Sequence, residues 1–104
     1  MLIVTTDSIP GKNFEMLGIV QGNIVRTKDL GRAFAAGLRS LAGGEVKIYT
    51  DLLNEARATA IDRMQEQARA LGADAIVCVR MTTCSVMDGS SEVTTYGTAV
   101  KFIN

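Results

Sequence analysis

The sequence contains no histidine and no tryptophan, and it has only one proline and two cysteines among 104 residues. Histidine is the usual activating partner of a nucleophilic cysteine, so its absence removes the common thiolate–imidazolium pair. It also removes the commonest metal ligand. Six carboxylates are scattered over predicted loops and strand ends, where a solvated surface position is the default interpretation: Asp7, Glu15, Glu45, Asp74, Asp88 and Glu92. We therefore expect a non-catalytic protein.

Charge of one sign is not in excess, because eleven Lys and Arg balance eleven Asp and Glu. A neutral mean field gives no electrostatic reason to expect binding to nucleic acid. No apolar run approaches the roughly 20 residues that span a bilayer, and the N-terminus MLIVTTDS has no basic leader region. We expect a cytoplasmic protein with no nucleic-acid or membrane partner, and near-zero net charge lowers the cost of self-association.

The two cysteines, Cys78 and Cys84, fall on one predicted strand. Six residues of extended strand span roughly 20 Å, so the two thiols cannot form a disulfide with each other without a bend. Paired cysteines at zinc-ligand spacing are absent. Cu(I) and other soft ions accept thiolates, which makes Cys78 and Cys84 the candidate metal ligands, alone or with donors from other copies around a ring axis. The alternative is that Cys78 is a small buried hydrophobe and Cys84 has no functional role.

Two segments before residue 30 have the composition of strands. The first is short, at residues 2–5, and a Pro-Gly turn follows it. The second covers residues 14–27 and is rich in β-branched side chains. Gly18 and Gly22 interrupt this run, which predicts a bend, a bulge or the close approach of another backbone.

Two helices are predicted next. Asp29 is a suitable N-cap for the first, which ends at Gly43-Gly44. Thr50 is placed to cap the second, after an extended segment at residues 45–49, and Gly72 ends it. The second helix has one apolar stripe, which consists of Leu53, Ala56, Ala60, Met64, Ala68 and Leu71.

The last two strands are predicted at residues 75–83 and 93–103, joined as an antiparallel hairpin. Simple alternation places Val77, Val79 and Met81 on one face of the first strand and Ile76, Cys78 and Arg80 on the other. On the second strand it places Tyr96, Val100 and Phe102 on one face. The order of elements predicts one α+β domain over residues 1–104, with helices on one face of an antiparallel sheet. We expect the other face, at Ile76 or Val77, to contact another subunit.

Four segments carry a family resemblance: LGIVQG at residues 17–22, the Gly43-Gly44 turn with Tyr49, LGADAIVCVR at residues 71–80 and YGTAV at residues 96–100. In this order and spacing the chain resembles the YbjQ family, small uncharacterised bacterial and archaeal proteins labelled as heavy-metal-binding. The resemblance covers nearly the whole chain. It implies a single YbjQ-like domain similar to the dodecin subunit, assembled into a closed ring, a homopentamer. Because the shared motifs are glycines and apolar residues, the resemblance transfers no catalytic or ligand residue.

We therefore expect a small homo-oligomeric binding protein that takes a metal ion or another small ligand at subunit interfaces. No cofactor is evident beyond a soft metal ion. One alternative is a structural or scaffold oligomer without a ligand, and another is an enzyme with a site between subunits. Replacement of both cysteines by serine separates a soft-metal binder from a binder of other small molecules.

Overall fold

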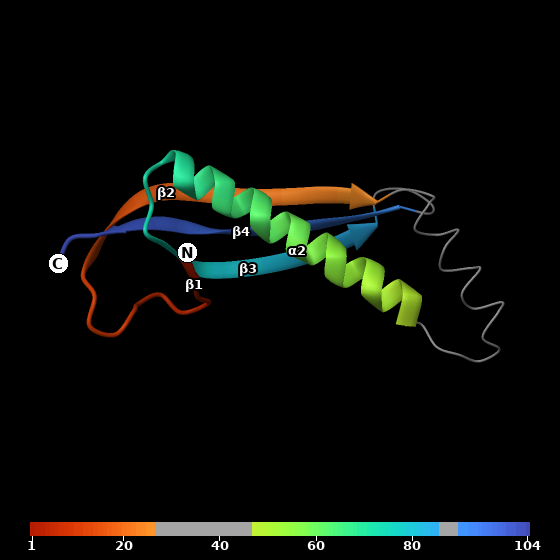
Figure 1. The fold of residues 1–104 in the computed structure, drawn as a ribbon, viewed down its shortest axis with the longest axis horizontal. Coiled ribbons are helices and arrows are strands. Elements are labelled where there is room, and N and C mark those ends of the chain that lie inside the picture. The colour runs from red at the N-terminus through yellow and green to blue at the C-terminus, as the bar shows by residue number, and fades with distance from the viewer. Residues whose placement is uncertain (27–46, 86–89) are drawn as a thin grey trace.

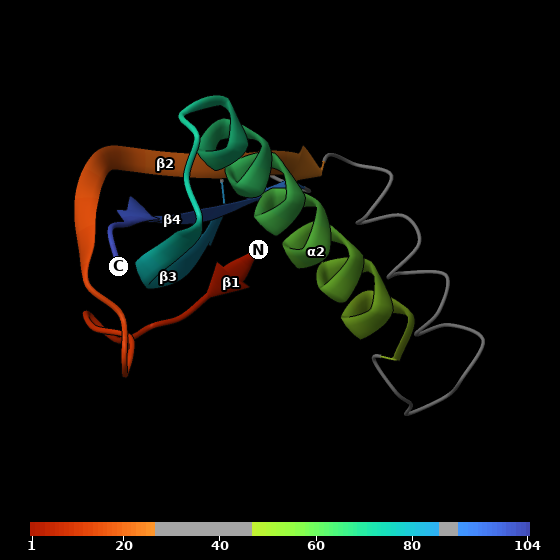
Figure 2. The ribbon, with the colours of Figure 1, turned by 60° about the vertical axis from the view of Figure 1, so that its left-hand side comes forward.

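The structure is a computed structural model that describes residues 1–26, 47–85 and 90–104. Its elements are β1 (Leu2–Ile3), β2 (Phe14–Arg26), α2 (Lys47–Ala70), β3 (Ala75–Ser85) and β4 (Ser91–Phe102). The strands form one sheet in the order β1-β3-β4-β2, and α2 lies across one face of it (Figures 1 and 2). The predicted α+β class is confirmed. The helix predicted over residues 29–43 lies outside the described residues.

The sheet is mixed, and the prediction of a wholly antiparallel sheet is wrong. β3 pairs with β4, and β4 with β2, in antiparallel fashion, so the predicted hairpin is confirmed. β1, however, lies parallel to β3, with Leu2 opposite Ala75 and Ile3 opposite Ile76. This short edge strand comes from the far end of the chain, and its direction follows from a contact that local sequence patterns do not encode. No helix in the described ranges is long and apolar enough to cross a membrane.

Both glycines that interrupt β2 have the predicted kinds of role. The register against β4 shifts between Met16 and Gly18, and Gly18 has a φ of 141°, so the strand contains a bulge there. Gly22 is the point of closest approach to the helix, because a β-carbon at this position would collide with the Ala60 carbonyl oxygen and the Met64 nitrogen of α2. The missing side chain at Gly22 is therefore what lets the backbone of α2 pack directly on β2.

The apolar stripe of α2 packs on the sheet much as its periodicity predicts. Ala56, Ala60, Met64 and Ala68 are fully buried, whereas Leu71 is 49% exposed and lies beyond the last helical residue. Val20 and Ile76 contact the C-terminal half of this stripe, and Val93 and Ile24 contact the N-terminal half. Small alanine side chains and Gly22 together bring the two layers close, and the core lies between α2 and strands β2, β3 and β4.

The two ends of α2 differ in how well the sequence predicts them. Gly72 has a φ of 81°, its N–H donates to the Arg69 carbonyl at 3.0 Å, and the Ala73 N–H donates to the Ala68 carbonyl at 3.0 Å. This is the paired-bond C-terminal cap for which glycine is favoured. The helix begins at Lys47, however, so Thr50 lies inside it and the predicted N-cap is wrong. Residues 47–50 contain no glycine or proline, so no helix-breaking residue prevents the helix from including them.

A bulge in β3 breaks the predicted alternation of faces. Cys78 has a φ of 56°, and the register against β4 shifts between Val77 and Arg80. As a result Val79 packs with Ile76 on the helix side of the sheet, while Cys78 packs with Val77 on the opposite side. The face assignment of Val79 and Cys78 from simple alternation is therefore wrong. An inserted residue reverses the alternation, and no glycine marks this one.

The N-terminal segment covers one end of the sheet face opposite α2. The Cys78 N–H donates to the Thr6 carbonyl at 2.9 Å, and the Val79 N–H donates to the Val4 carbonyl at 3.0 Å. Val4 and Ile9 pack against Val77, which is 1% exposed, while Ile76 is fully buried on the helix side. The prediction that Ile76 or Val77 contacts another subunit is thus wrong, because the chain itself buries both side chains.

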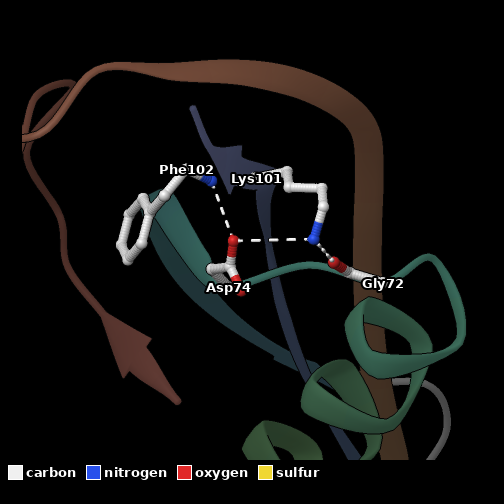
Figure 3. A network of polar contacts seen from close by, with 4 residues as sticks. All are labelled: Gly72, Asp74, Lys101 and Phe102. Carbon is white, nitrogen blue, oxygen red and sulfur yellow. Dashed lines mark hydrogen bonds and ion pairs between the residues drawn. The ribbon is translucent and has the colours of Figure 1, made fainter. Parts of the chain in front are cut away.

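A polar cluster joins the turn after α2 to the end of β4 (Figure 3). The Asp74 carboxylate accepts a hydrogen bond from the Phe102 N–H at 2.8 Å and lies 3.8 Å from the Lys101 ammonium. Lys101 Nζ also donates to the Gly72 carbonyl at 3.4 Å. Two of these three contacts reach backbone atoms, the Phe102 N–H and the Gly72 carbonyl, so we interpret the cluster as structural.

Candidate metal-binding face

The sheet face opposite α2, here called the outer face, carries the side chains that are candidates for binding a metal ion or another subunit. It is defined by the strand positions that alternate with those packed on the helix. Outside the cluster that Val4 and Ile9 cover, its members are Met16, Ile19, Gln21, Asn23 and Val25 on β2, Arg80, Thr82 and Cys84 on β3, and Glu92, Thr94, Tyr96 and Thr98 on β4.

Large apolar side chains on the outer face are open to solvent. Ile19 is 82% exposed, Met16 is 72% exposed and Tyr96 is 40% exposed. Tyr96 lies on the same face as Val100 and Phe102, which confirms the predicted alternation of β4, but only the last two are covered by the N-terminal segment. An isolated exposed apolar residue is ordinary, whereas several on one sheet face are typical of an interaction surface.

Cys84 is the next-to-last residue of β3 and lies directly opposite Glu92 of β4. Its thiol donates a hydrogen bond to the Glu92 carboxylate, with Sγ 3.6 Å from Oε1. Partial desolvation, this hydrogen bond and the charge of the carboxylate, in that order, raise the pKa of the Cys84 thiol. The protonated thiol is therefore favoured at neutral pH, and a metal ion that binds here has to displace the proton.

Cys78 occupies the β3 bulge, on the same side of the sheet as Cys84. Its side chain is partly buried against the cluster that Val4 and Ile9 cover, whereas Cys84 is exposed. Both cysteines of the chain are unpaired thiols, in agreement with the expectation that they form no disulfide. The structure thus places both candidate ligands on one face but in different surroundings.

A closed metal site needs more donors than one copy supplies in the described ranges. Structural zinc sites take about four ligands. Within residues 1–26, 47–85 and 90–104, no group of three or more cysteine and acidic side chains converges. The pair formed by Cys84 and Glu92 offers one sulfur and one carboxylate. These are two of the about four ligands that a closed site needs.

Sequence reasoning identified Cys84 but not its partner. Glu92 was predicted to lie on the solvated surface with the other scattered carboxylates. In the structure its carboxylate accepts a hydrogen bond from the Cys84 thiol. The hairpin register supplies the missing signal, because pairing Cys84 with Glu92 across the turn follows once the loop length is known. No periodicity in either strand reports that pairing by itself.

Comparison with known proteins gives one family and one fold. The model of the YbjQ_1 family, described as "Putative heavy-metal-binding", matches residues 1–103. The UPF0145 protein of Vibrio parahaemolyticus is 54% identical over 104 residues and is covered to 99%, as is this chain. The UPF0145 protein of Thermosipho melanesiensis is also 54% identical, with 99% of this chain and 96% of the relative covered.

A crystal structure of a DUF74-family protein of unknown function from Pediococcus pentosaceus has a similar fold. Its TM-score is 0.63 at 17% identity, and the match covers 99% of this chain and 98% of the other. At this identity the likeness concerns the fold alone.

Proposed function

Since the chain belongs to the YbjQ family, whose model carries the description "Putative heavy-metal-binding", we propose that it is a non-catalytic cytoplasmic homo-oligomer that binds a soft metal ion between its subunits. The assembly is a closed ring, a homopentamer of dodecin-like subunits, as the family resemblance implies. Cysteine thiolates are the ligands. The observation that carries the proposal is that Cys84 and Glu92 form an accessible sulfur–carboxylate pair on the face opposite α2.

The incomplete donor set favours a site shared between copies. Soft ions such as Cu(I) and Cd²⁺ select thiolate sulfur, and a neighbouring copy supplies the donors that the described part of one chain lacks. Reduced thiols are the ordinary state of cysteine in the cytoplasm, which keeps the ligands available. Cys78, beside the N-terminal segment, is the second candidate ligand, and its partial burial makes it less accessible than Cys84.

Exposed apolar residues on the outer face supply the driving force for association. Burial of about 100 Å² of apolar surface contributes about 2.5 kcal/mol before the entropic costs of association. Ile19 and Met16 offer such surface, and the balanced charge adds no net repulsion between copies. Ile19→Asp should therefore lower the oligomer mass measured by light scattering. Leu71→Asp is the matched control, because Leu71 is also exposed but lies after α2.

Titration with Cd²⁺ tests the metal site, read by thiolate-to-metal charge-transfer absorption and by equilibrium dialysis. The wild-type protein should bind in a fixed ratio to subunits. Cys84→Ser should weaken binding by about tenfold or more, and the double variant Cys78→Ser with Cys84→Ser should abolish it. Met81→Leu, which removes a thioether from the same strand, is the control and should bind as the wild type does.

Two results would reject the soft-metal site. Wild-type protein that gives no charge-transfer band is not a thiolate metal binder, and a scaffold or a binder of another small ligand then becomes the better account. Cd²⁺ binding that survives removal of both cysteines would place the metal on other donors. The Ile19→Asp experiment is separate, so failure of the metal site and failure of the interface are distinguishable.

A further inference from the structure

β2 is an edge strand of the sheet, and side chains of α2 contact its backbone. Among residues 1–26, 47–85 and 90–104 it stands last in the sheet order, with a strand partner, β4, on one side, and it runs for 13 residues. The outer edge of such a strand presents backbone N–H and C=O groups that can pair with a strand of another chain. Proteins block such edges because uncontrolled strand addition leads to aggregation. Contacts from α2 lie on the side of β2 that faces away from β4.

Two side chains of α2 bond to the backbone of this edge. The Gln21 N–H donates to Gln67 Oε1 at 2.9 Å, and Arg63 Nη1 donates to the Asn23 carbonyl at 2.7 Å. Gln21 and Asn23 are alternate residues, whose backbone groups point to the same side of the strand. Arg63 and Gln67 are one helical turn apart and lie on the same helix face. We call these two hydrogen bonds the edge clasp.

Gly22 is what allows the helix to reach the edge. It lies between the two clasped residues, and α2 packs against its backbone where any larger residue would collide with the helix. Arg63 and Gln67 can therefore reach past the face of the sheet to its side. Both side chains are exposed to solvent. Hydrogen bonds at an exposed position are individually weak, so the clasp can open while the core between α2 and the sheet stays intact.

We propose that the edge clasp is an autoinhibitory contact that keeps β2 closed to strand addition by a second copy of this chain. When the clasp opens, the Gln21 N–H and the Asn23 carbonyl become available to an extended strand. The β2 edge of a second copy fits them, because antiparallel pairing across a two-fold axis makes the same edge self-complementary. This interaction uses the edge of the sheet and is independent of the proposed contact through its outer face.

The helix carries its own matched control. Arg69 Nη2 donates to Gln65 Oε1 at 3.0 Å, so the same two residue types on the same helix bond to each other instead. The clasp variant is Arg63→Ala with Gln67→Ala, and the control variant is Gln65→Ala with Arg69→Ala. Both remove one arginine and one glutamine from α2, which equalises changes in charge and helix propensity. Gln67→Glu is a conservative variant that keeps an acceptor for the Gln21 N–H.

The experiment measures amide hydrogen exchange at Gln21 and the formation of larger species. At protein concentrations too low for strand addition, the Gln21 amide of the clasp variant should exchange about tenfold faster than in the wild type, because its acceptor is gone. Light scattering should show larger species at a lower protein concentration than in the control variant. Gln67→Glu should retain the wild-type exchange rate and mass. Circular dichroism verifies the fold, and the single variants serve if the double variant does not fold.

Two outcomes would overturn the proposal. An unprotected Gln21 amide in the wild-type protein would mean that the clasp does not form in solution. A clasp variant that loses Gln21 protection but keeps the mass of the control at every protein concentration tested would mean that the clasp does not block strand addition at this edge.

Discussion

Replacing Gly22 by alanine is the sharpest test of how α2 is positioned. The added β-carbon would meet the Ala60 carbonyl oxygen, the Met64 nitrogen and, at 2.9 Å, the β-carbon of Arg63. Ordinary carbon contacts lie near 3.5–4.0 Å, so the backbone of the helix has to retreat by roughly 1 Å. Rotation of a flexible side chain cannot relieve this overlap, because the atoms belong to backbone or are β-carbons.

The magnitude follows from two opposing effects. The smaller entropy of the unfolded alanine chain stabilises the variant by about 0.4–1 kcal/mol. Overpacking against backbone destabilises it by about 3 kcal/mol, at the upper end of the usual range. The second effect is larger, so we expect Gly22→Ala to lose about 2–3 kcal/mol of unfolding free energy. A domain of this size has roughly 5–15 kcal/mol to lose, so the variant should still fold.

Urea unfolding followed by circular dichroism measures this loss. Asn23→Ala is the control, because its side chain points to the outer face, and the backbone carbonyl that Arg63 contacts remains. Its unfolding free energy should stay within about 0.5 kcal/mol of wild type. If Gly22→Ala is as stable as Asn23→Ala, the helix does not pack on β2 at this residue, and the reasoning about the clasp loses its basis as well.

Three further predictions concern single contacts. Because Cys78 has a φ of 56°, the Cys78→Gly variant should be more stable than Cys78→Ala by about 0.5–1 kcal/mol in urea unfolding. This is the reverse of the usual order in strands, and the usual order would argue against the bulge. Asp74→Ala should cost about 1–2 kcal/mol, because the Phe102 N–H loses a charged but partly solvated acceptor, whereas Lys101→Ala should cost less than about 0.5 kcal/mol. Equal losses would mean that the ion pair dominates. In a Cys78→Ser background, Glu92→Gln should lower the raised pKa of the Cys84 thiol and speed its alkylation by iodoacetamide near pH 8. An unchanged dependence of the alkylation rate on pH would mean that Glu92 does not contact Cys84 in solution.

Local sequence patterns predicted the elements whose signals are local. The cap at Gly72 and the buried stripe through Met64 follow from a helix period and a residue that tolerates positive φ. Gly18 and Gly22 marked a bulge and a close approach, although the sequence could not say which glycine had which role. These features depend on neighbours along the chain.

Features that depend on distant segments were missed. Val77 looked like an interface residue because β3 is apolar on both faces, and its cover comes from Val4 and Ile9 at the other end of the chain. The bulge at Cys78 has no glycine to announce it, so alternation gave the wrong face for Val79. The clasp residue Arg63 resembled any solvated helix arginine, because its partner is a backbone carbonyl on another element.

Native mass spectrometry of the protein purified without chelator and without added metal tests the central claim most directly, because it reports subunit number and retained ligand together. We predict a homopentamer that carries a stoichiometric extra mass of a soft metal ion and loses this mass when Cys78 and Cys84 are both replaced by serine. A bare monomer that takes up no added Cd²⁺ would contradict both the assembly and the shared thiolate site.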